Sequence, residues 1–276
     1  MRSPFGASLR IGLSGTRITL LHSGGWRQPR FRVLAEADVT NDARAAADHH
    51  MTTLRHLLQE AQCSKLLTTI ILADDWVRYF MVTPPRNAVR LQDCKAAASL
   101  RFQTLYGESP GDWQLDADWD ACRPFLACAI PRTLLDGLQR IAIEHRLTIV
   151  GIVPHFIAAC NQWRKHWRPA AWFGTVHGNI LTLGVRDRQR ICTVRSTLLA
   201  NDICHERHWL ARHVSREALI LNLSAPDQVQ LCGDVPEQWI TEAAGPFTYV
   251  QLDMPTPALD SPMSAGAILA MTGLRR

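Results

Sequence analysis

The chain opens twice with the same order of elements, and this repetition constrains its fold more than any other feature of the 276 residues. In each half, two short segments of alternating apolar and polar residues flank a glycine-containing turn, which predicts a β-hairpin. A third strand and a helix follow each hairpin. In the first half these elements are expected at 9–13, 16–21, 31–34 and about 43–61, and in the second at 171–177, 180–185, 190–195 and 202–213. Two such openings predict two α/β lobes of similar architecture.

The segment between the two openings predicts further strands and helices. Residues 66–72 are nearly all apolar, which is typical of a strand covered on both faces. The segment 76–82 predicts a strand that Pro84 and Pro85 end. The other elements expected in this segment are helices at 89–106, 131–145 and 155–167 and strands at 113–119, 124–130 and 147–153. After the second opening we expect a strand at 218–223, a helix near 236–243, a strand at 247–252 and a helix at 264–274.

The composition is that of a folded protein outside the membrane. Apolar residues make up 47% of the chain and charged residues 20%, which argues against disorder. No apolar run approaches the roughly 20 residues of a spanning helix, and no apolar core follows the first six residues as in a secretory signal. The eight cysteines include no CxxC pair and are expected to be reduced. The cytosol is therefore the expected compartment.

The net charge of +5 is spread along the chain. Because a nucleic-acid-binding protein usually gathers its Lys and Arg on one face, we expect no nucleic-acid partner. Such a charge is compatible with an acidic partner or an anionic membrane surface. The most concentrated basic segment, 163–168, has tryptophans at both ends. We expect these rings to pack on the adjoining lobe, and a patch that touches headgroups or an acidic peptide is the alternative.

Two segments imitate metal sites without the required spacing. In 204–208 the two histidines are three residues apart, whereas a helical zinc pair needs four. In 116–120 three aspartates alternate, but Ala121 and Ala127 stand where a calcium loop needs Gly and Glu. The chain also has no GxSxG or Walker A motif. We therefore predict no metal site and no hydrolase nucleophile.

The order of elements resembles the actin-like fold, in which a ribonuclease-H-like unit is duplicated. Within that fold, the chain resembles the PilM family of type IV pilus assembly and the cytoplasmic domain of the GspL family of type II secretion. Three passages carry the resemblance: 71–85, a strand, polar turn, strand and proline step; 147–159, a strand ending at a proline before a crossing helix; and 266–274, a C-terminal helix. The resemblance implies a first lobe at 1–160 with an inserted subdomain at about 74–130, a second lobe at 161–265, and a C-terminal helix at 266–276 that packs back.

The nucleotide site that the resemblance implies is degenerate in this sequence. Actin-like ATPases place an acidic residue and glycines at the first hairpin, but here the turn reads Ser14, Gly15 and Thr16. The matching hairpin of the second half contains Gly174 and no carboxylate. The adenosine loop, expected after 218–223, reads Ser-Ala-Pro-Asp. These four residues, Ser14, Gly15, Thr16 and Gly174, are the candidates for a residual nucleotide site. We predict no cofactor and no ATPase activity, with bound ATP and Mg as the alternative.

The predicted function is that of a non-catalytic scaffold at the cytoplasmic face of the inner membrane. By resemblance, the chain would bind the short cytoplasmic tail of a single-span inner-membrane protein similar to PilN, with a motor ATPase nearby. An exposed strand edge or an inter-lobe groove suits such a tail through strand addition. The candidate residues for this contact are Trp76, Arg78, Phe80, Pro84 and Pro85.

Two other classes of function stay open. The first is an actin-like protein that binds ATP through a divergent site. The second is an enzyme such as a sugar kinase on the same fold, which requires a catalytic carboxylate in the cleft between the lobes. The sequence alone offers no good candidate for that carboxylate. It also leaves open whether the machine is a pilus or a secretion system, which protein is the partner, and how the chain oligomerises.

Overall fold

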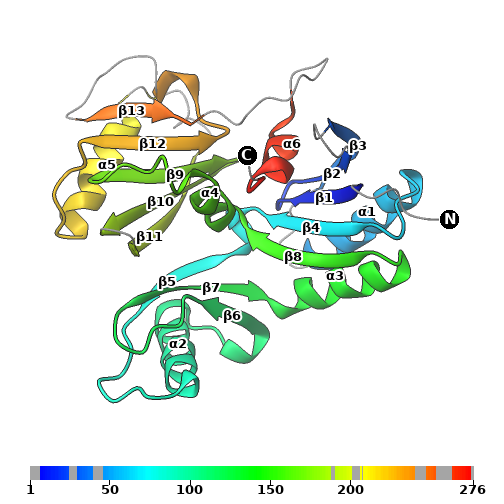
Figure 1. Ribbon diagram of the computed structural model, residues 1–276. Helices are drawn as coiled ribbons and strands as arrows, with labels where there is room; N and C mark the ends of the chain where they lie inside the picture. The colour runs from blue at the N-terminus through cyan, green and yellow to red at the C-terminus, as the bar shows by residue number, and fades with distance from the viewer. Residues whose placement is uncertain are drawn as a thin grey trace.

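The computed structural model describes residues 7–24, 30–39, 46–187, 190–200, 206, 208–239, 247–252 and 263–274 (Figure 1). The first lobe is built on a five-stranded sheet of order β3-β2-β1-β4-β8. Its strands are β1 Ser8–Leu13, β2 Arg17–Gly24, β3 Arg30–Asp38, β4 Leu67–Leu72 and β8 Thr148–Pro154. Helices α1 (Ala46–Glu60) and α3 (Arg132–Glu144) pack against each other and against this sheet.

The second lobe repeats this strand order. Its sheet has the order β11-β10-β9-β12-β13. Its strands are β9 Ala171–His177, β10 Ile180–Asp187, β11 Arg190–Leu198, β12 Gln228–Gly233 and β13 Thr248–Gln251. In both sheets the first three strands are antiparallel, and the fourth and fifth are added in parallel. The predicted duplicated α/β architecture is confirmed.

Two helices tie the lobes together by crossing between them. Helix α4 (His155–Trp163) leaves β8 of the first lobe and packs on β9, whereas α6 (Ala265–Met271) ends the second lobe and packs on β1 and β2. Glycines in the receiving sheets allow the close approach, since a Cβ at Gly184 of β10 would lie 2.4 Å from the Phe156 ring and one at Gly12 of β1 would lie 2.8 Å from the Gly266 carbonyl. The buried guanidinium of Arg10 also donates to two carbonyl oxygens at the end of α6, each at 2.6 Å.

A small antiparallel unit, the subdomain, lies between β4 and α3. Its sheet has the order β5-β7-β6, from β5 (Arg78–Val82), β6 (Trp113–Ala117) and β7 (Phe125–Pro131). Helix α2 (Leu91–Tyr106) follows β5 and packs on the sheet, and Figure 1 shows the unit below both lobes. Phe80, Phe102 and Phe125 form its core. The short 3-10 helices η1 (Asp74–Trp76) and η2 (Pro110–Asp112) precede β5 and β6.

One part of the second lobe differs from the sequence prediction. The helix expected at 202–213 is α5 at Trp209–Ile220, and the strand expected at 218–223 falls on the end of α5 and the turn after it. The apolar residues there resembled a buried strand, yet Leu219 and Ile220 are 82% and 58% exposed. The fourth strand of this sheet is β12, whose glutamines hide the apolar pattern expected of a buried strand. The Gln230 side chain is buried because it is hydrogen-bonded: it accepts from the Arg168 N–H at 3.1 Å and donates to the His166 carbonyl oxygen at 2.9 Å.

The ends of several elements fall partly outside the described residues. Residues 43–45 of the first expected helix, 201–205 and 207 before α5, and 240–246 of the helix expected near 236–243 are among them; the described part of the last is η4 (Glu237–Trp239). The tryptophans of the basic segment, Trp163 and Trp167, are buried, and the Trp167 ring packs on Phe173 of the second lobe. No helix in the described ranges has both the length and the hydropathy to cross a bilayer.

Candidate functional site

The turn of the first hairpin is held by the chain itself. The Ser14 hydroxyl accepts from the Arg17 N–H at 3.0 Å, and the Thr16 carbonyl accepts from the Val39 N–H at 2.8 Å. The backbone N–H of Gly15 donates to Oδ2 of Asp75 at 2.6 Å. A phosphate bound at this turn would need such an N–H, and here a carboxylate from η1 already occupies it.

Asp75 is a carboxylate with only one of its two oxygens hydrogen-bonded across the chain. Its Oδ1 is buried and has no hydrogen-bond partner among the described residues. Burial raises the pKa of Asp75 from 3.8 to about 6, and the neighbouring Asp74 charge also raises it, while the hydrogen bond from Gly15 lowers it. Asp75, which follows β4, therefore brings a carboxylate to a hairpin turn whose own residues include none.

Asp74 joins the three parts of the molecule. It is 5% exposed and accepts from the Tyr79 hydroxyl at 2.6 Å, the Phe156 N–H at 3.1 Å and the Thr175 hydroxyl at 3.1 Å. These donors come from the subdomain, from the first turn of α4 and from β9 of the second lobe. Burial raises the pKa of Asp74, and these hydrogen bonds oppose that effect. The side chain is therefore committed to structure on both oxygens.

The hairpin of the second lobe, formed by β9 and β10, lies close to these two aspartates and makes packing contacts there. Gly174 lies inside β9, where a Cβ would stand 2.8 Å from the side chains of Leu183 and Leu231, and the turn itself is at Gly178 with φ of 55°. The rings of His155 and His177 meet edge to face with centroids 5.9 Å apart. Burial lowers the pKa of each to about 4, so both rings are neutral near pH 7.

The fourth strand of the second sheet is β12, so the loop that follows this strand is not the segment after residue 223 that the sequence indicated. It follows β12 and contains Gly233 and Asp234. Gly233 has a φ of 96°, and a Cβ there would lie 2.2 Å from the Val176 carbonyl oxygen. That oxygen accepts from the Asp234 N–H at 2.8 Å. The Ser-Ala-Pro-Asp segment at 224–227 follows α5 and precedes β12, so it does not stand after the fourth strand, where the resemblance placed the adenosine loop. We call the region where Gly15, Asp74, Asp75, His155, Thr175 and His177 meet the hairpin junction.

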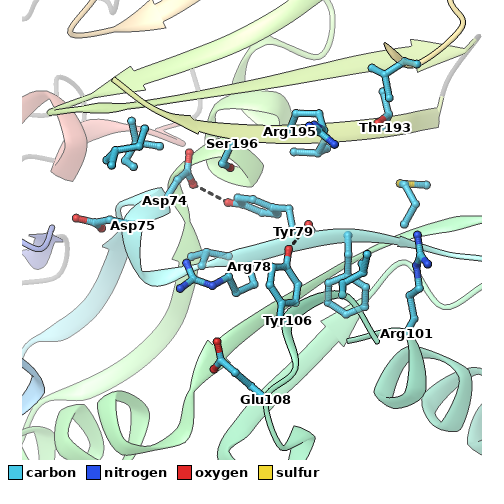
Figure 2. Close-up of a pocket in the computed structure, with 18 residues that line it drawn as sticks. Asp74, Asp75, Arg78, Tyr79, Arg101, Tyr106, Glu108, Thr193, Arg195 and Ser196 are labelled. Carbon is cyan, nitrogen blue, oxygen red and sulfur yellow. Dashed lines mark hydrogen bonds between the residues drawn. The ribbon is translucent and has the colours of Figure 1, made fainter. Parts of the chain in front are cut away.

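A second region between the lobes is open. Strands β5 and β11, each an edge strand of its sheet, lie next to each other, and a cleft of about 850 Å³ opens beside them (Figure 2). We call it the edge-strand cleft. Its walls include the end of α2 and the turn after α5. The lining residues are Asp74, Asp75, Val77, Arg78, Tyr79, Phe80, Met81, Arg101, Leu105, Tyr106, Glu108, Ile180, Thr193, Val194, Arg195, Ser196, Leu198 and Leu221.

Aromatic rings organise the subdomain wall of this cleft. The Arg78 guanidinium lies 5.9 Å from the centre of the Tyr106 ring and 5.7 Å from that of Trp113. The Tyr106 hydroxyl donates to the Tyr79 carbonyl at 2.9 Å, as Figure 2 shows. Cation–π contacts of this kind fix a guanidinium without neutralising its charge. The Arg78 charge is therefore held in place at the cleft wall.

The five residues predicted to contact a partner do not lie together on one surface of the structure. Arg78 and Phe80 line the edge-strand cleft, but the Phe80 ring is 3% exposed and packs on Phe102 in the subdomain core. Trp76 packs on His50 of α1, with ring centroids 5.0 Å apart. Pro85 lines a separate groove of about 840 Å³ along α2, and Pro84 lines neither space.

Sequence reasoning missed several residues that define these sites. Arg101 and Tyr106 lie on α2 and Arg195 lies on β11, far away in the sequence, and nothing local marks them. Asp74 and Asp75 did carry a signal, because two adjacent carboxylates directly follow a buried strand and strand ends of α/β sheets commonly face ligand crevices.

Of the two segments that imitate metal sites, the structure describes the one at 116–120. Asp120 accepts from the Cys122 and Arg123 N–H groups and pairs with Arg190 of β11. Most of 204–208 falls outside the described residues. Within those ranges, no group of three or more His, Cys, Asp or Glu side chains is placed to hold a metal ion.

Comparisons with known proteins give the fold a context. Neither a protein-family model nor a curated protein sequence matches this chain. A structure of the PilM-PilN type IV pilus biogenesis complex matches with a TM-score of 0.62 and 12% identity, over 91% of this chain and 89% of that one. A Bacteroides thetaiotaomicron protein with an actin-like ATPase fold and unknown function matches at 0.58 and 11%, over 84% of each chain.

The cytoplasmic domain of EpsL, an inner-membrane component of the Vibrio cholerae type II secretion system, matches with a TM-score of 0.56 and 11% identity, over 97% of this chain and 94% of that one. These are structures from the two families that the sequence resembles. At such low identity the likeness concerns the fold. The chain therefore has the duplicated actin-like fold, and PilM and the cytoplasmic domain of EpsL are among its structural neighbours.

Proposed function

We propose that the chain is a non-catalytic scaffold of a type IV pilus or type II secretion-like assembly, at the cytoplasmic face of the inner membrane. Its role is to bind the cytoplasmic tail of a PilN-like membrane protein in the edge-strand cleft, with a motor ATPase as a further partner. The observation that carries this proposal is the open cleft beside the edge strands β5 and β11, whose apolar and cationic walls suit an extended peptide. Its fold neighbours are a protein solved in complex with PilN and a secretion-system domain.

The hairpin junction supports the non-catalytic part of the proposal. The Gly15 N–H is engaged by Asp75, and Asp74 accepts from three parts of the chain. The neutral His155 and His177 rings pack beside them. A Mg–nucleotide would have to displace these contacts before it could bind, and each displaced buried group costs about 1–3 kcal/mol.

The direct test is calorimetric titration with a synthetic peptide of the cytoplasmic tail of a PilN-like single-span membrane protein. We expect micromolar binding that Arg78→Glu weakens at least about tenfold. Arg86→Glu, an exposed arginine of the same subdomain outside the cleft lining, is the matched control and should bind normally. Equal binding by both variants, or none by the unmodified chain, would reject this function.

One observation favours a second candidate, a divergent ATP site. Two carboxylates do lie beside the first hairpin turn, although the sequence suggested none. Titration with Mg–ATP decides between the two. We expect no heat and no thermal shift up to millimolar nucleotide. Micromolar binding that Asp75→Ala abolishes would assign Asp75 to the metal and make the chain a nucleotide-binding protein.

A further inference from the structure

Three arginines from three different elements reach the edge-strand cleft. Arg78 lies on β5, Arg101 on α2 and Arg195 on β11, and Figure 2 shows them around Tyr79 and Tyr106. All three lower the pKa of the Tyr106 hydroxyl, against the larger raising effect of its burial, which places their charges around one point. Three arginine charges therefore act on the Tyr106 hydroxyl, where Glu108 is the acidic neighbour, although the chain as a whole spreads its charge.

Three acidic residues, Asp74, Asp75 and Glu108, also line the cleft. Asp74 and Asp75 are hydrogen-bonded to protein groups at the hairpin junction. Glu108 is the remaining acidic residue of the lining. Arg195 has a partner, the buried Glu217 of α5, at 3.3 Å. Among the described residues, Arg78 and Arg101 form no ion pair with a carboxylate.

The shape of the cleft favours a peptide over a small anion. Leu105, Leu198 and Leu221 line it together with the arginines, so apolar and cationic groups share the walls. A free phosphate would leave these leucines uncovered, whereas an extended segment places successive side chains on opposite sides of its backbone. Such a segment can direct carboxylates to the arginines and apolar side chains to the leucines.

We propose that the segment bound in the edge-strand cleft is extended and acidic, with Asp or Glu side chains paired to Arg78 and Arg101 and apolar side chains between them. This inference rests on the proposed function, because it specifies the chemistry of the tail that the cleft receives. Charge-assisted pairs with guanidinium groups give both orientation and affinity. Arg78, which its two aromatic neighbours already fix, loses little further freedom on binding.

The test uses three fluorescein-labelled dodecapeptides with one Thr/Leu framework that carries Glu, Gln or Lys at the same positions. Fluorescence anisotropy with the full chain should give a Kd for the Glu peptide at least about tenfold lower than for the Gln peptide, and no binding of the Lys peptide. Arg78→Glu with Arg101→Glu should remove binding of the Glu peptide and allow binding of the Lys peptide. Arg86→Glu with Arg140→Glu, two exposed arginines elsewhere, should change neither.

The outcomes separate this inference from the function on which it rests. Equal affinity for the Glu and Gln peptides, or a Glu peptide that binds the doubly substituted chain as well as the original, overturns the acidic assignment. If the tail of the PilN-like membrane protein still binds and Arg78→Glu still weakens its binding, the scaffold function stands and only the charge chemistry is wrong. Binding of a single-stranded oligonucleotide through the same two arginines, with no preference for the Glu peptide, would also overturn it.

Discussion

The hairpin junction and the edge-strand cleft are two inter-lobe regions that treat their polar groups in opposite ways. At the junction, Gly15, Thr175 and the first turn of α4 donate to Asp74 and Asp75, so the hydrogen bonds that a ligand would need are made within the chain. In the cleft, Arg78 and Arg101 face a space of about 850 Å³ and, among the described residues, form no ion pair with a carboxylate.

This difference distinguishes polar groups that connect the two lobes from polar groups that are available to bind a partner. Internally satisfied buried polar groups stabilise one arrangement of the lobes, and removing one leaves its partners unsatisfied. An exposed, unpaired arginine contributes little to folding and is free to bind. The following predictions test whether the two regions differ in this way.

The largest effect is expected for Asp74→Asn. The new amide NH₂ group faces donors from Tyr79, Thr175 and α4, so at least one buried donor loses its acceptor. We expect the free energy of unfolding to fall by about 2–4 kcal/mol. Urea denaturation measures this, with Asp136→Asn on the exposed face of α3 as the control. A loss as small as that of the control would mean that Asp74 does not join the lobes.

The next effect concerns acid stability and His155. Its pKa is lowered from 6.5 to about 4, so between these values the unfolded chain binds a proton that the folded chain does not. Stability from this group is complete above pH 6.5 and is lost as the pH falls towards 4, by about 1.4 kcal/mol per pH unit. Urea denaturation from pH 4.5 to 7 should show a slope smaller by this amount in His155→Gln. Parallel slopes would show that the ring is protonated in the folded chain.

The smallest effect is expected in the edge-strand cleft. Arg101→Gln removes an exposed side chain that has no ion-pair partner in the described part of the chain, so the free energy of unfolding should change by no more than about 0.5 kcal/mol. Thermal and urea denaturation measure this change, and the binding experiments above measure the loss of affinity. A destabilisation above about 1 kcal/mol would give Arg101 a structural role and weaken the contrast between the two regions.

The sequence predicted most elements because their signals are local. Both hairpins, the apolar strand β4 and the helices α2 and α3 follow from alternation, helical spacing and prolines at their ends. The prediction failed at α5 and β12, where apolar residues did not mark a buried strand and a polar residue did not mark an exposed one. Leu219 and Ile220 are apolar but exposed, and Gln230 is polar but buried because it bonds to two backbone groups.

The candidate sites depended far more on tertiary structure. Arg78 was identified from its segment, whereas its cleft neighbours Arg101 and Arg195 lie on other elements. The missing carboxylate of the first hairpin turn came from Asp75, sixty residues along the chain from Gly15. No pattern within one segment reports such a pairing.

The sequence by itself determined the duplicated order of strands and helices, since alternation, turn residues and helical periodicity act between near neighbours in the chain. Only the tertiary structure decided which carboxylate meets which hairpin, which arginines share a cleft and which apolar residues stay exposed. The physical reason is that these contacts depend on how the sheets and crossing helices bring distant segments together. Asp74 and Thr175, 101 residues apart in sequence, meet because α4 crosses from one lobe to the other.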